Sequence, residues 1–243
     1  SRAGSPYFEL EAFTWPASLD ARAASGARIE LRLAADLDRL TYRAIALLLR
    51  GEDDRRLRTE DRADPPSLAV GEVLSLDRGG GDVEVVETEP GEPRWLAIRF
   101  RCSTEEVASR ILRAGRPIQY AHVTEPLALW DVQTPFAARP MAFEMPSAGR
   151  PLALPLLRDL RRRGVTIAFV SHAAGLSSTG RASLDERFPL PERFEVPRAT
   201  AEAILQARAR GGRVVAVGTS VVRSLESAAL RAPPGSAIAE AQG

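Results

Sequence analysis

The clearest set of residue types for ligand chemistry lies near the carboxyl end, in the stretch RVVAVGTSVVRSLES. The apolar residues 213–217 predict a buried strand, and residues 221–230 predict a helix. Between them, Gly218, Thr219 and Ser220 form a small turn that bears two hydroxyl groups. A helix start offers free backbone N–H groups and the positive end of the helix dipole, and glycine lets a ligand approach closely. The turn is therefore a predicted ligand site, although a simple helix cap would leave the same pattern.

Three ionisable side chains are candidates for chemistry. Arg223 and Glu226 are three residues apart on the predicted helix, so they face the same side, as functional groups or as a plain surface ion pair. His172 follows a second apolar run, residues 165–171, which predicts another buried strand. A histidine at a strand end can act as an acid, a base or a ligand contact, although a lone histidine is more often structural. The sequence has only two histidines, at no metal-binding spacing, and shows no Ser-His-Asp set, so we predict no metal site.

A third segment, residues 119–152, is long, irregular and rich in proline, yet it carries aromatic side chains. A stretch of this kind in a compact domain is either functional or disordered, and the aromatic residues argue against disorder. Within it, Ser147, Ala148 and Gly149 form a turn of small residues where backbone can approach a ligand. The alternative is that the aromatic side chains simply pin a crossover onto the core.

The elements that must position these residues change character along the chain. The first half predicts short strands, with a glycine turn at 79–81 and a charged, solvated loop at 51–66. The strand patterns cover residues 28–33, 41–49 (a strand or a short helix), 73–76, 82–88 and 94–100. After Cys102, helices alternate with apolar runs. The helices are predicted near 104–114, after a capping box at Ser103 and Glu106, and at 152–163 and 199–210.

These patterns predict the fold class α/β plus β. We expect a parallel-containing α/β domain with a smaller antiparallel β-barrel-like domain. Residues 1–18 are expected to belong to the α/β domain, residues 19–101 to form the barrel-like domain, and residues 102–243 to complete the α/β domain with the site.

Composition excludes some classes of function. The chain has 243 residues with 44% hydrophobic residues and a net charge of +1, so overall charge does not identify a nucleic-acid binder. The single cysteine, Cys102, allows neither an internal disulfide nor a cysteine metal cluster. No apolar run approaches the ~18 residues that span a membrane, and we see no signal peptide. We therefore expect a cytoplasmic protein that does not associate with membranes.

The three segments resemble, in order and spacing, the S-adenosylmethionine:tRNA ribosyltransferase-isomerase family of queuosine biosynthesis. The family motif G-T-T-S-V-R-x-L-E-S stands at residues 218–227 as GTSVVRSLES. The motif P-T-A-G-L-H-F stands at 146–152 as PSAGRPL. The stretch Y-Q-T-V-Y/F resembles residues 132–136, and R-G-V-x-x-A-F-V-T-L-H resembles residues 163–172.

This resemblance implies a larger α/β domain with an inserted β-barrel domain. It also implies a reaction in which S-adenosylmethionine, as co-substrate and without a metal, donates its ribosyl part. The acceptor would be a 7-aminomethyl-7-deazaguanine base in tRNA, and the products would be epoxyqueuosine, adenine and methionine. The implied partner is tRNA, and we expect a monomer.

The resemblance also implies roles for the candidate residues. Arg223 would hold a carboxylate or phosphate, Glu226 would orient Arg223, and His172 is the remaining titratable candidate. The residues implied to line the nucleoside pocket are Gly218, Thr219 and Ser220, with Ser147, Ala148 and Gly149 as the facing wall.

Departures from the family pattern favour a second hypothesis. Pro151 replaces the histidine of P-T-A-G-L-H-F, and the family's later H-x-E pair aligns with Pro191 and Arg193. Losing a general acid or base typically costs ~10²–10⁴-fold in rate. The alternative is a diverged paralogue that binds a nucleoside or RNA without turnover, and a third hypothesis is a family fragment with a structural role.

Overall fold

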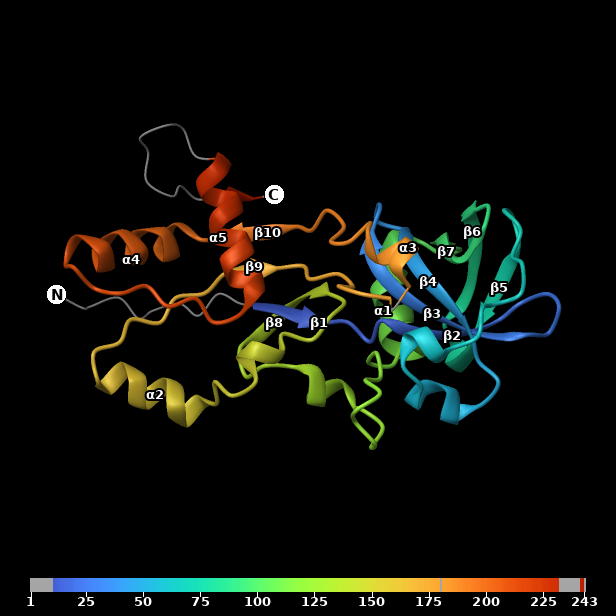
Figure 1. The fold of residues 1–243 in the computed structure, drawn as a ribbon, viewed down its shortest axis with the longest axis horizontal. Helices are drawn as coiled ribbons and strands as arrows, with labels where there is room; N and C mark the ends of the chain where they lie inside the picture. Colours follow the sequence, from blue (N-terminus) through green and yellow to red (C-terminus); the bar gives the residue numbers. More distant parts are fainter. Residues whose placement is uncertain (1–10, 180, 232–240, 243) are drawn as a thin grey trace. The chain divides into compact units, whose positions relative to one another are not determined.

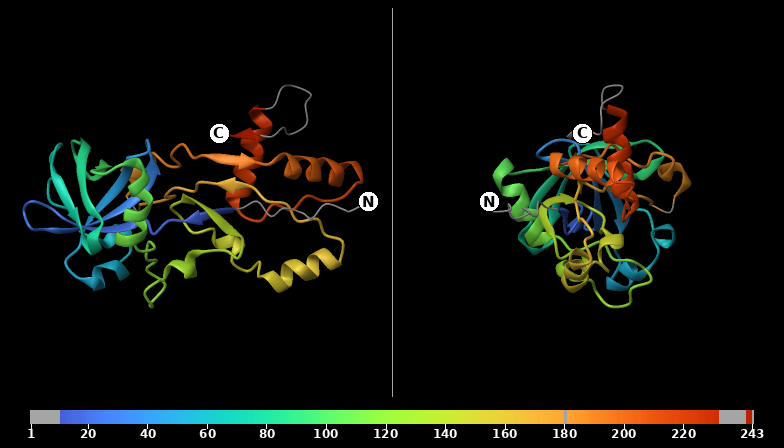
Figure 2. Two further views of the ribbon diagram at one scale, coloured as in Figure 1. Left: turned by 180° about the vertical axis from the view of Figure 1, so that it is seen from behind. Right: turned by 90° about the vertical axis from the view of Figure 1, so that its left-hand side faces the viewer.

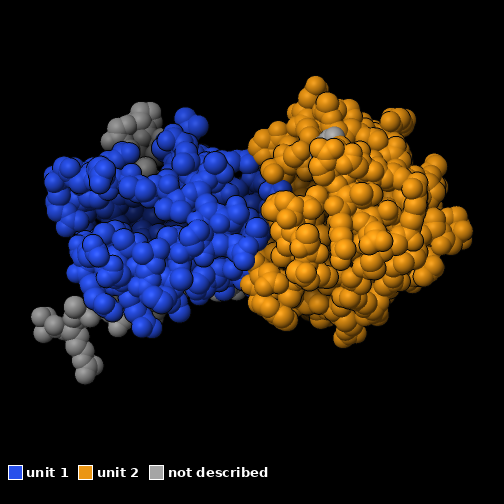
Figure 3. Space-filling model, turned by 60° about the horizontal axis from the view of Figure 1, so that its bottom comes forward, with its two compact units in different colours: residues 1–13, 133–174, 192–243 blue, residues 14–132, 175–191 orange. Residues whose placement is uncertain are grey.

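The computed structural model describes residues 11–179, 181–231 and 241–242. The chain divides into two compact units, which Figure 3 shows in different colours. Unit 1 comprises Ser1–Phe13, Gln133–Ala174 and Glu192–Gly243, and unit 2 comprises Thr14–Val132 and Gly175–Pro191. Each unit is therefore assembled from segments that are far apart in the sequence.

Unit 2 is built on a closed barrel with the strand order β2-β3-β4-β7-β6-β5 (Figure 1). Its neighbouring strands pair antiparallel. The strands are β2 (Ser18–Arg22), β3 (Arg28–Asp36), β4 (Thr41–Leu48), β5 (Val73–Leu76), β6 (Gly81–Glu89) and β7 (Glu92–Phe100). The predicted antiparallel barrel is confirmed, and the apolar residues 41–49 form a strand and not a helix.

Strand β3 is buried on both of its faces. Ile29, Leu31 and Leu33 alternate along the strand and are fully buried, as expected for residues that face a barrel interior. Glu30 and Arg32 point to the opposite face, and they are also buried. Because burying a charge is costly unless the charge is paired, this outer face needs both a cover and counter-charges.

The charged stretch 51–66 supplies this cover. It contains two short 3₁₀ helices, η1 (Glu52–Arg56) and η2 (Thr59–Asp61). Nη1 of Arg62 donates to Oε2 of Glu30 at 2.8 Å, and Arg55 pairs with Asp20 on β2. The expectation of a solvated loop is therefore wrong for this part of the chain, because carboxylates on the barrel draw its arginines into buried ion pairs.

Helix α1 (Thr104–Ala114) follows the barrel and begins as the sequence predicts. Ser103 and Glu106 form both halves of a capping box, which satisfies two free backbone N–H groups. Gly80, in the turn between β5 and β6, lies so close to the helix that an added Cβ would come 2.5 Å from Cβ of Ala114. The glycine turn thus allows α1 to pack tightly on the barrel.

Residues 175–191 return to the barrel after passing through unit 1. Leu176 and Leu184 join a core cluster with Trp95 of β7, and Arg181 pairs with Glu92 at 2.6 Å. Helix α3 (Ala182–Asp185) lies in this segment. Unit 2 therefore extends beyond the expected bounds of 19–101, because both α1 and this returning segment pack on the barrel. Residues 1–10 of the expected N-terminal segment lie outside the described residues.

The described part of unit 1 combines helices with short strands (Figures 1 and 2). The helices are α2 (Leu154–Arg162), α4 (Arg198–Ala209) and α5 (Thr219–Arg231), with 3₁₀ helix η5 (Ser147–Gly149). The strands are β1 (Glu11–Thr14), β8 (Ala137–Ala142), β9 (Ser171–His172), β10 (Phe194–Val196) and β11 (Ala241–Gln242). Strand β1 pairs with β8, and β9, β10 and β11 form a second sheet.

Helix α5 packs on strands β9 and β10. Val170, Phe194, Val196 and Ala228 form the buried cluster between them. With this helix-covered sheet in unit 1 and the barrel in unit 2, the predicted fold class of an α/β domain with a smaller antiparallel barrel is confirmed.

Two apolar runs that the sequence predicts as buried strands do not form a common sheet. Residues 165–170 and 213–217 are not strands, and β9 pairs antiparallel with β10 instead. Val215 is 75% exposed, so the second run is not buried either. Apolar composition predicts a buried strand only where a hydrogen-bonded neighbour and a covering helix are both present, and composition alone does not identify the neighbour. The expectation that Gly218 ends a strand of that sheet is therefore wrong.

Candidate active site in unit 1

Gly218 and Ala148 bring two of the predicted segments face to face. Gly218 has a φ of +104°, in the region that favours glycine, and it immediately precedes α5. Its carbonyl accepts a hydrogen bond from the N–H of Val222 at 3.4 Å. A Cβ at position 218 would lie 3.3 Å from Cβ of Ala148 on η5. Small residues at both positions therefore let the start of α5 and the Ser147–Gly149 turn approach each other closely.

The segment before η5 is tied to the segment that follows His172. The backbone N–H groups of Phe143 and Glu144 both donate to the carbonyl of Ala174, at 2.7 and 3.1 Å. In the adjoining strand pair, His172 of β9 lies opposite Phe194 of β10. The three segments that the sequence marks for chemistry thus meet in one framework inside unit 1, whose surface is hollowed on the face shown in Figure 3.

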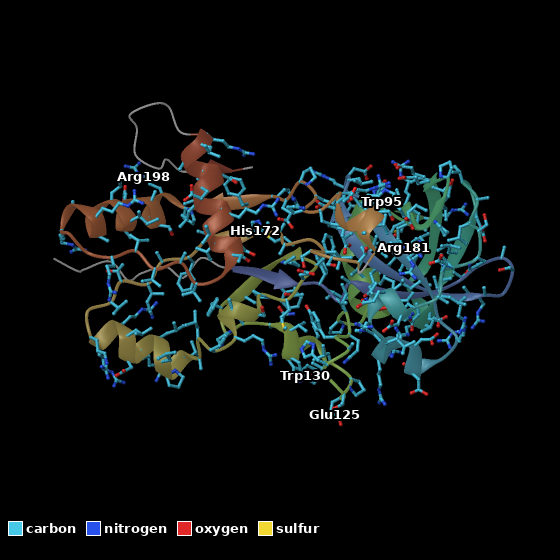
Figure 4. The ribbon with its side chains drawn as sticks, viewed as in Figure 1. Trp95, Glu125, Trp130, His172, Arg181 and Arg198 are labelled. Carbon is cyan, nitrogen blue, oxygen red and sulfur yellow. The ribbon has the colours of Figure 1, made fainter. Side chains whose placement is uncertain are left out.

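Glu192 connects His172 to Arg223. Its Oε2 lies 3.3 Å from Nε2 of His172 and pairs with Nη1 of Arg223 on α5. The side chains of His172 and Glu192 are each only 7% exposed, whereas that of Arg223 is 39% exposed. Figure 4 shows His172 beside α5. Because a helix rises 1.5 Å per residue, Arg223 lies about 7.5 Å along the helix axis from Gly218.

The two ring nitrogens of His172 have different surroundings. Nε2 faces the carboxylate of Glu192, and Nδ1 is buried without a hydrogen-bond partner among the residues that the structure describes. A carboxylate that holds one nitrogen of an imidazole while the other nitrogen is left for a reacting group is an arrangement suited to proton transfer. The guanidinium of Arg223, partly exposed at the edge of this group, is suited to binding an anionic group.

Glu226 does not take the role expected for it. Its side chain is exposed, and the carboxylate that pairs with Arg223 is Glu192. A spacing of three residues permits a pair on a helix surface but does not enforce one, and a buried carboxylate gains more from a guanidinium than a solvated one does. The expectation that Glu226 orients Arg223 is therefore wrong.

The other predicted pocket residues line this region to different extents. Gly149 is buried, and Gly218 and Ser220 are half-buried. Thr219, Ser147 and Ala148 are exposed. The carbonyl of Ser220 accepts a hydrogen bond from Oγ of Ser224 at 2.9 Å, so its backbone is held inside the first turn of α5.

Sequence reasoning missed Glu192. This residue stands between Pro191 and Arg193, the two positions that align with the family's H-x-E pair. The carboxylate that was considered lost at Arg193 is thus supplied one residue earlier. A one-residue shift of the alignment, anchored on the apolar start of β10 at Phe194, was the signal that could have found it.

No group of three His, Cys, Asp or Glu side chains that could hold a metal ion occurs in residues 11–179, 181–231 and 241–242. In the same described residues, no helix is both long and apolar enough to cross a membrane. Cys102 is a free thiol whose pKa is raised by burial, which disfavours the reactive thiolate.

Comparisons with known proteins agree on one family. The family model described as queuosine biosynthesis protein matches residues 11–242. The S-adenosylmethionine:tRNA ribosyltransferase-isomerase of Xylella fastidiosa (strain M23) is 34% identical over 216 residues, which cover 88% of this chain and 57% of the relative. The protein of the same name from Sorangium cellulosum (strain So ce56) is 37% identical over 186 residues, which cover 72% and 48% of the two chains.

A solved structure, the S-adenosylmethionine tRNA ribosyltransferase of Thermotoga maritima, aligns with 97% of this chain and 57% of its own at 22% identity, with a TM-score of 0.30. The chain thus spans about half the length of the relatives that it matches. Because the family model covers nearly all of its residues, the chain belongs to the queuosine biosynthesis protein family.

Proposed function

We propose that this chain carries the active site of a transferase that moves the ribosyl part of S-adenosylmethionine onto 7-aminomethyl-7-deazaguanine in tRNA, to form epoxyqueuosine. S-adenosylmethionine acts as co-substrate, and the proposed reaction requires no metal. We also propose that the protein is a monomer and that it acts on tRNA in the cytoplasm.

One observation carries the proposal: three separate segments with family motifs meet within unit 1. The Gly218 turn lies so close to Ala148 that a Cβ added at position 218 would come 3.3 Å from Cβ of Ala148. The carboxylate of Glu192 links Arg223 on α5 to His172. Motifs retained only as helix caps or as surface pairs would have no reason to converge. A shared ligand gives that reason.

The convergence supports a division of roles. The backbone of Gly218, with the hydroxyl groups of Thr219 and Ser220, would contact the nucleoside at the positive end of α5. Ser147, Ala148 and Gly149 would form the opposite wall. The guanidinium of Arg223 matches the carboxylate of a methionine moiety in charge and in planar geometry. His172 would accept or donate a proton, because its buried Nδ1 has no hydrogen-bond partner within the described residues.

Adenine release tests this function. The purified chain is incubated with S-adenosylmethionine and tRNA that carries the deazaguanine base, and free adenine is measured over time. The expected result is release that requires both substrates and that falls by ~10²-fold or more in His172→Ala. Release that does not depend on the tRNA, or that is unchanged in the variant, would contradict the proposal.

A second candidate function is nucleoside or RNA binding without turnover. Pro151 stands where the family has a histidine, and no histidine precedes Glu192 at the position of the H-x-E pair, whereas the backbone turn at Gly218 is retained. A backbone-lined pocket needs glycine and a helix start, whereas proton transfer needs titratable groups. Binding of S-adenosylmethionine without any adenine release would favour this second candidate.

A further inference from the structure

We propose that Glu192 is a positioning residue of the active site, which fixes His172 so that Nδ1 is the working nitrogen and holds Arg223 beside it. This inference rests on the proposed function, since it names how the groups of that site are held. The role that it assigns to Glu192, which is to hold both His172 and Arg223, is not implied by the family motifs quoted above.

The geometry places one carboxylate oxygen between two different groups. Oε2 of Glu192 is 3.3 Å from the His172 ring and is also the atom paired with Arg223. The three residues come from separate elements: His172 from β9, Arg223 from α5, and Glu192 from the residues just before β10. The carboxylate therefore connects a strand, a helix and a loop at one point, so a change at position 192 would displace both neighbours.

Electrostatics explains why the carboxylate is placed there. A carboxylate that is 93% buried is costly to keep ionised unless a cation pairs with it, and Arg223 is such a cation. The ionised carboxylate then favours a proton, and not a lone pair, on the nitrogen that faces it. In the neutral imidazole, the proton lies on Nε2 and Nδ1 is left as the acceptor.

The buried Nδ1 points to a missing partner. Buried polar atoms are nearly always hydrogen-bonded in proteins, so the unpaired Nδ1 of His172 calls for an explanation, and a catalytic role is one. An acceptor nitrogen can take a proton from a ligand: the N–H bond forms at Nδ1, the ligand's bond to hydrogen breaks, and its electron pair stays on the ligand. Glu192 would stabilise the resulting imidazolium. Because Nδ1 is sealed from solvent, ligand binding must displace a neighbouring side chain.

Histidine NMR tests the inference on the full chain, because the sequence has only two histidines. In protein labelled with ¹⁵N in its imidazoles, S-adenosylmethionine should move the Nδ1 signal of His172 more than its Nε2 signal. The exposed His122 is the internal reference and should not move. Glu192→Ala should shift the Nε2 signal before any ligand is added, and Glu192→Gln, which keeps an acceptor oxygen, should shift it less.

Ligand affinity provides a readout that a purely structural role would not move. Titration calorimetry with S-adenosylmethionine should show at least tenfold weaker binding for Glu192→Ala. The same substitution should weaken binding by a smaller factor in a chain that already carries His172→Ala, because the two residues act as a unit. Glu202→Gln, which removes a carboxylate from an exposed ion pair with Arg198, is the matched control and should bind like the native chain. Should Glu192→Ala fail to fold, Glu192→Gln serves for the titration.

The outcomes separate this inference from the proposed function. If S-adenosylmethionine binds but leaves both nitrogens of His172 unmoved, or if Glu192→Ala binds it as tightly as the native chain, the inference is wrong and the function stands. The inference is also wrong if the loss of binding free energy in the double variant, Glu192→Ala with His172→Ala, equals the sum of the losses in the two single variants. If S-adenosylmethionine does not bind the native chain, the inference and the proposed function fail together.

Discussion

Glu30 and Glu192 are two of the buried carboxylates that pair with arginines in this chain. Glu30 lies on the barrel and pairs with Arg32 and Arg62, and Glu192 lies in unit 1 and pairs with Arg223. Burial alone would raise the pKa of Glu30, but the guanidinium groups of Arg32 and Arg62 and the hydrogen bonds it accepts hold that pKa well below its ordinary value. The Glu30 pairs are shut away from solvent, whereas the Arg223 pair is partly open, so the first serves stability and the second is available to a ligand.

At neutral pH we expect Glu30→Gln to lower the free energy of unfolding of unit 2 by about 3–5 kcal/mol, because it leaves two buried guanidinium groups without a counter-charge. The effect also depends on pH. A group whose pKa is lowered in the folded state contributes stability that is present above its ordinary pKa, near 4.5, and is lost as the pH falls toward the folded value. The difference between native chain and variant should therefore narrow between pH 5 and pH 3, as measured by urea unfolding.

Glu87→Gln is the matched control, because Glu87 pairs with Arg43 but is 53% exposed. This substitution should change stability by less than about 1 kcal/mol at any pH in the range. A difference between native chain and Glu30→Gln that stays constant from pH 7 to pH 3 would show that Glu30 is not the charged centre of the barrel network.

Among the elements, the turn before α5 is the one whose backbone a ligand would meet. We expect Gly218→Ala to weaken binding of S-adenosylmethionine for two reasons. The φ of +104° strains any residue with a Cβ, by about 1–3 kcal/mol, and the new methyl group would lie 3.3 Å from Cβ of Ala148. Calorimetric titration measures the loss. A second variant, Gly218→Ala with Ala148→Gly, removes the crowding but not the strain, and it should recover part of the affinity.

Recovery in the double variant would show that the two turns face each other across the site. Equal binding by the native chain and Gly218→Ala would mean that the turn is an ordinary helix start. Gly211→Ala is a control for strain alone, because Gly211 also has positive φ but has open space around it.

Local signals in the sequence were sufficient for most elements. Five of the six barrel strands were predicted from alternation and turn residues, although residues 41–49 also fitted a short helix, and strand β2 was not predicted. Helix α1 was predicted from its capping box, because this signal acts within a few residues. The prediction of a strand at 213–217 was wrong, because whether apolar residues pair in a sheet depends on a neighbouring strand that the local sequence does not specify. The prediction of a solvated loop at 51–66 was wrong for the same reason, because the carboxylates that pair with its arginines, Asp20 and Glu30, lie elsewhere in the chain.

The same distinction holds for the site. Motifs mark Gly218 and Ser147–Gly149 in the sequence, and the structure brings these two turns close together. Glu192 was missed because the H-x-E pair was aligned one residue too late, and its contacts with His172 and Arg223 appear only when β9, β10 and α5 come together.

For the whole molecule, charge is divided unequally between the two units. Unit 1 has 14 arginines and 9 carboxylate residues, a net charge of +5, whereas unit 2 has 19 and 23, a net charge of −4. In unit 2 many arginines are paired with carboxylates. In unit 1, by contrast, Arg158 and Arg162 on α2 are exposed and form no ion pair within the described chain. The overall charge of +1 therefore hides a basic surface on the unit that holds the candidate site.

We expect the variant Arg158→Ala with Arg162→Ala to bind tRNA several-fold more weakly at 0.15 M salt. Each lost phosphate contact removes ~0.7–0.9 from the slope of log affinity against log salt, so the slope should flatten by about 1.4–1.8 if both arginines contact phosphates. Filter binding across a salt series measures this slope. Arg22→Ala with Arg56→Ala makes the same change in charge at exposed sites of unit 2 and is the control. An equal loss in both double variants would mean that only net charge matters.

The central claim, that unit 1 binds S-adenosylmethionine through the Gly218 turn and Arg223, is tested most directly by thermal unfolding with and without this compound. Ligand at 100 times its Kd stabilises the folded state by about 2.7 kcal/mol, so we predict a rise of several degrees in Tm for the native chain. Arg198→Ala, at an exposed site in the same unit, should show the same rise, and Arg223→Ala should show none. An unchanged Tm in the native chain, or an equal rise in Arg223→Ala, would contradict the account.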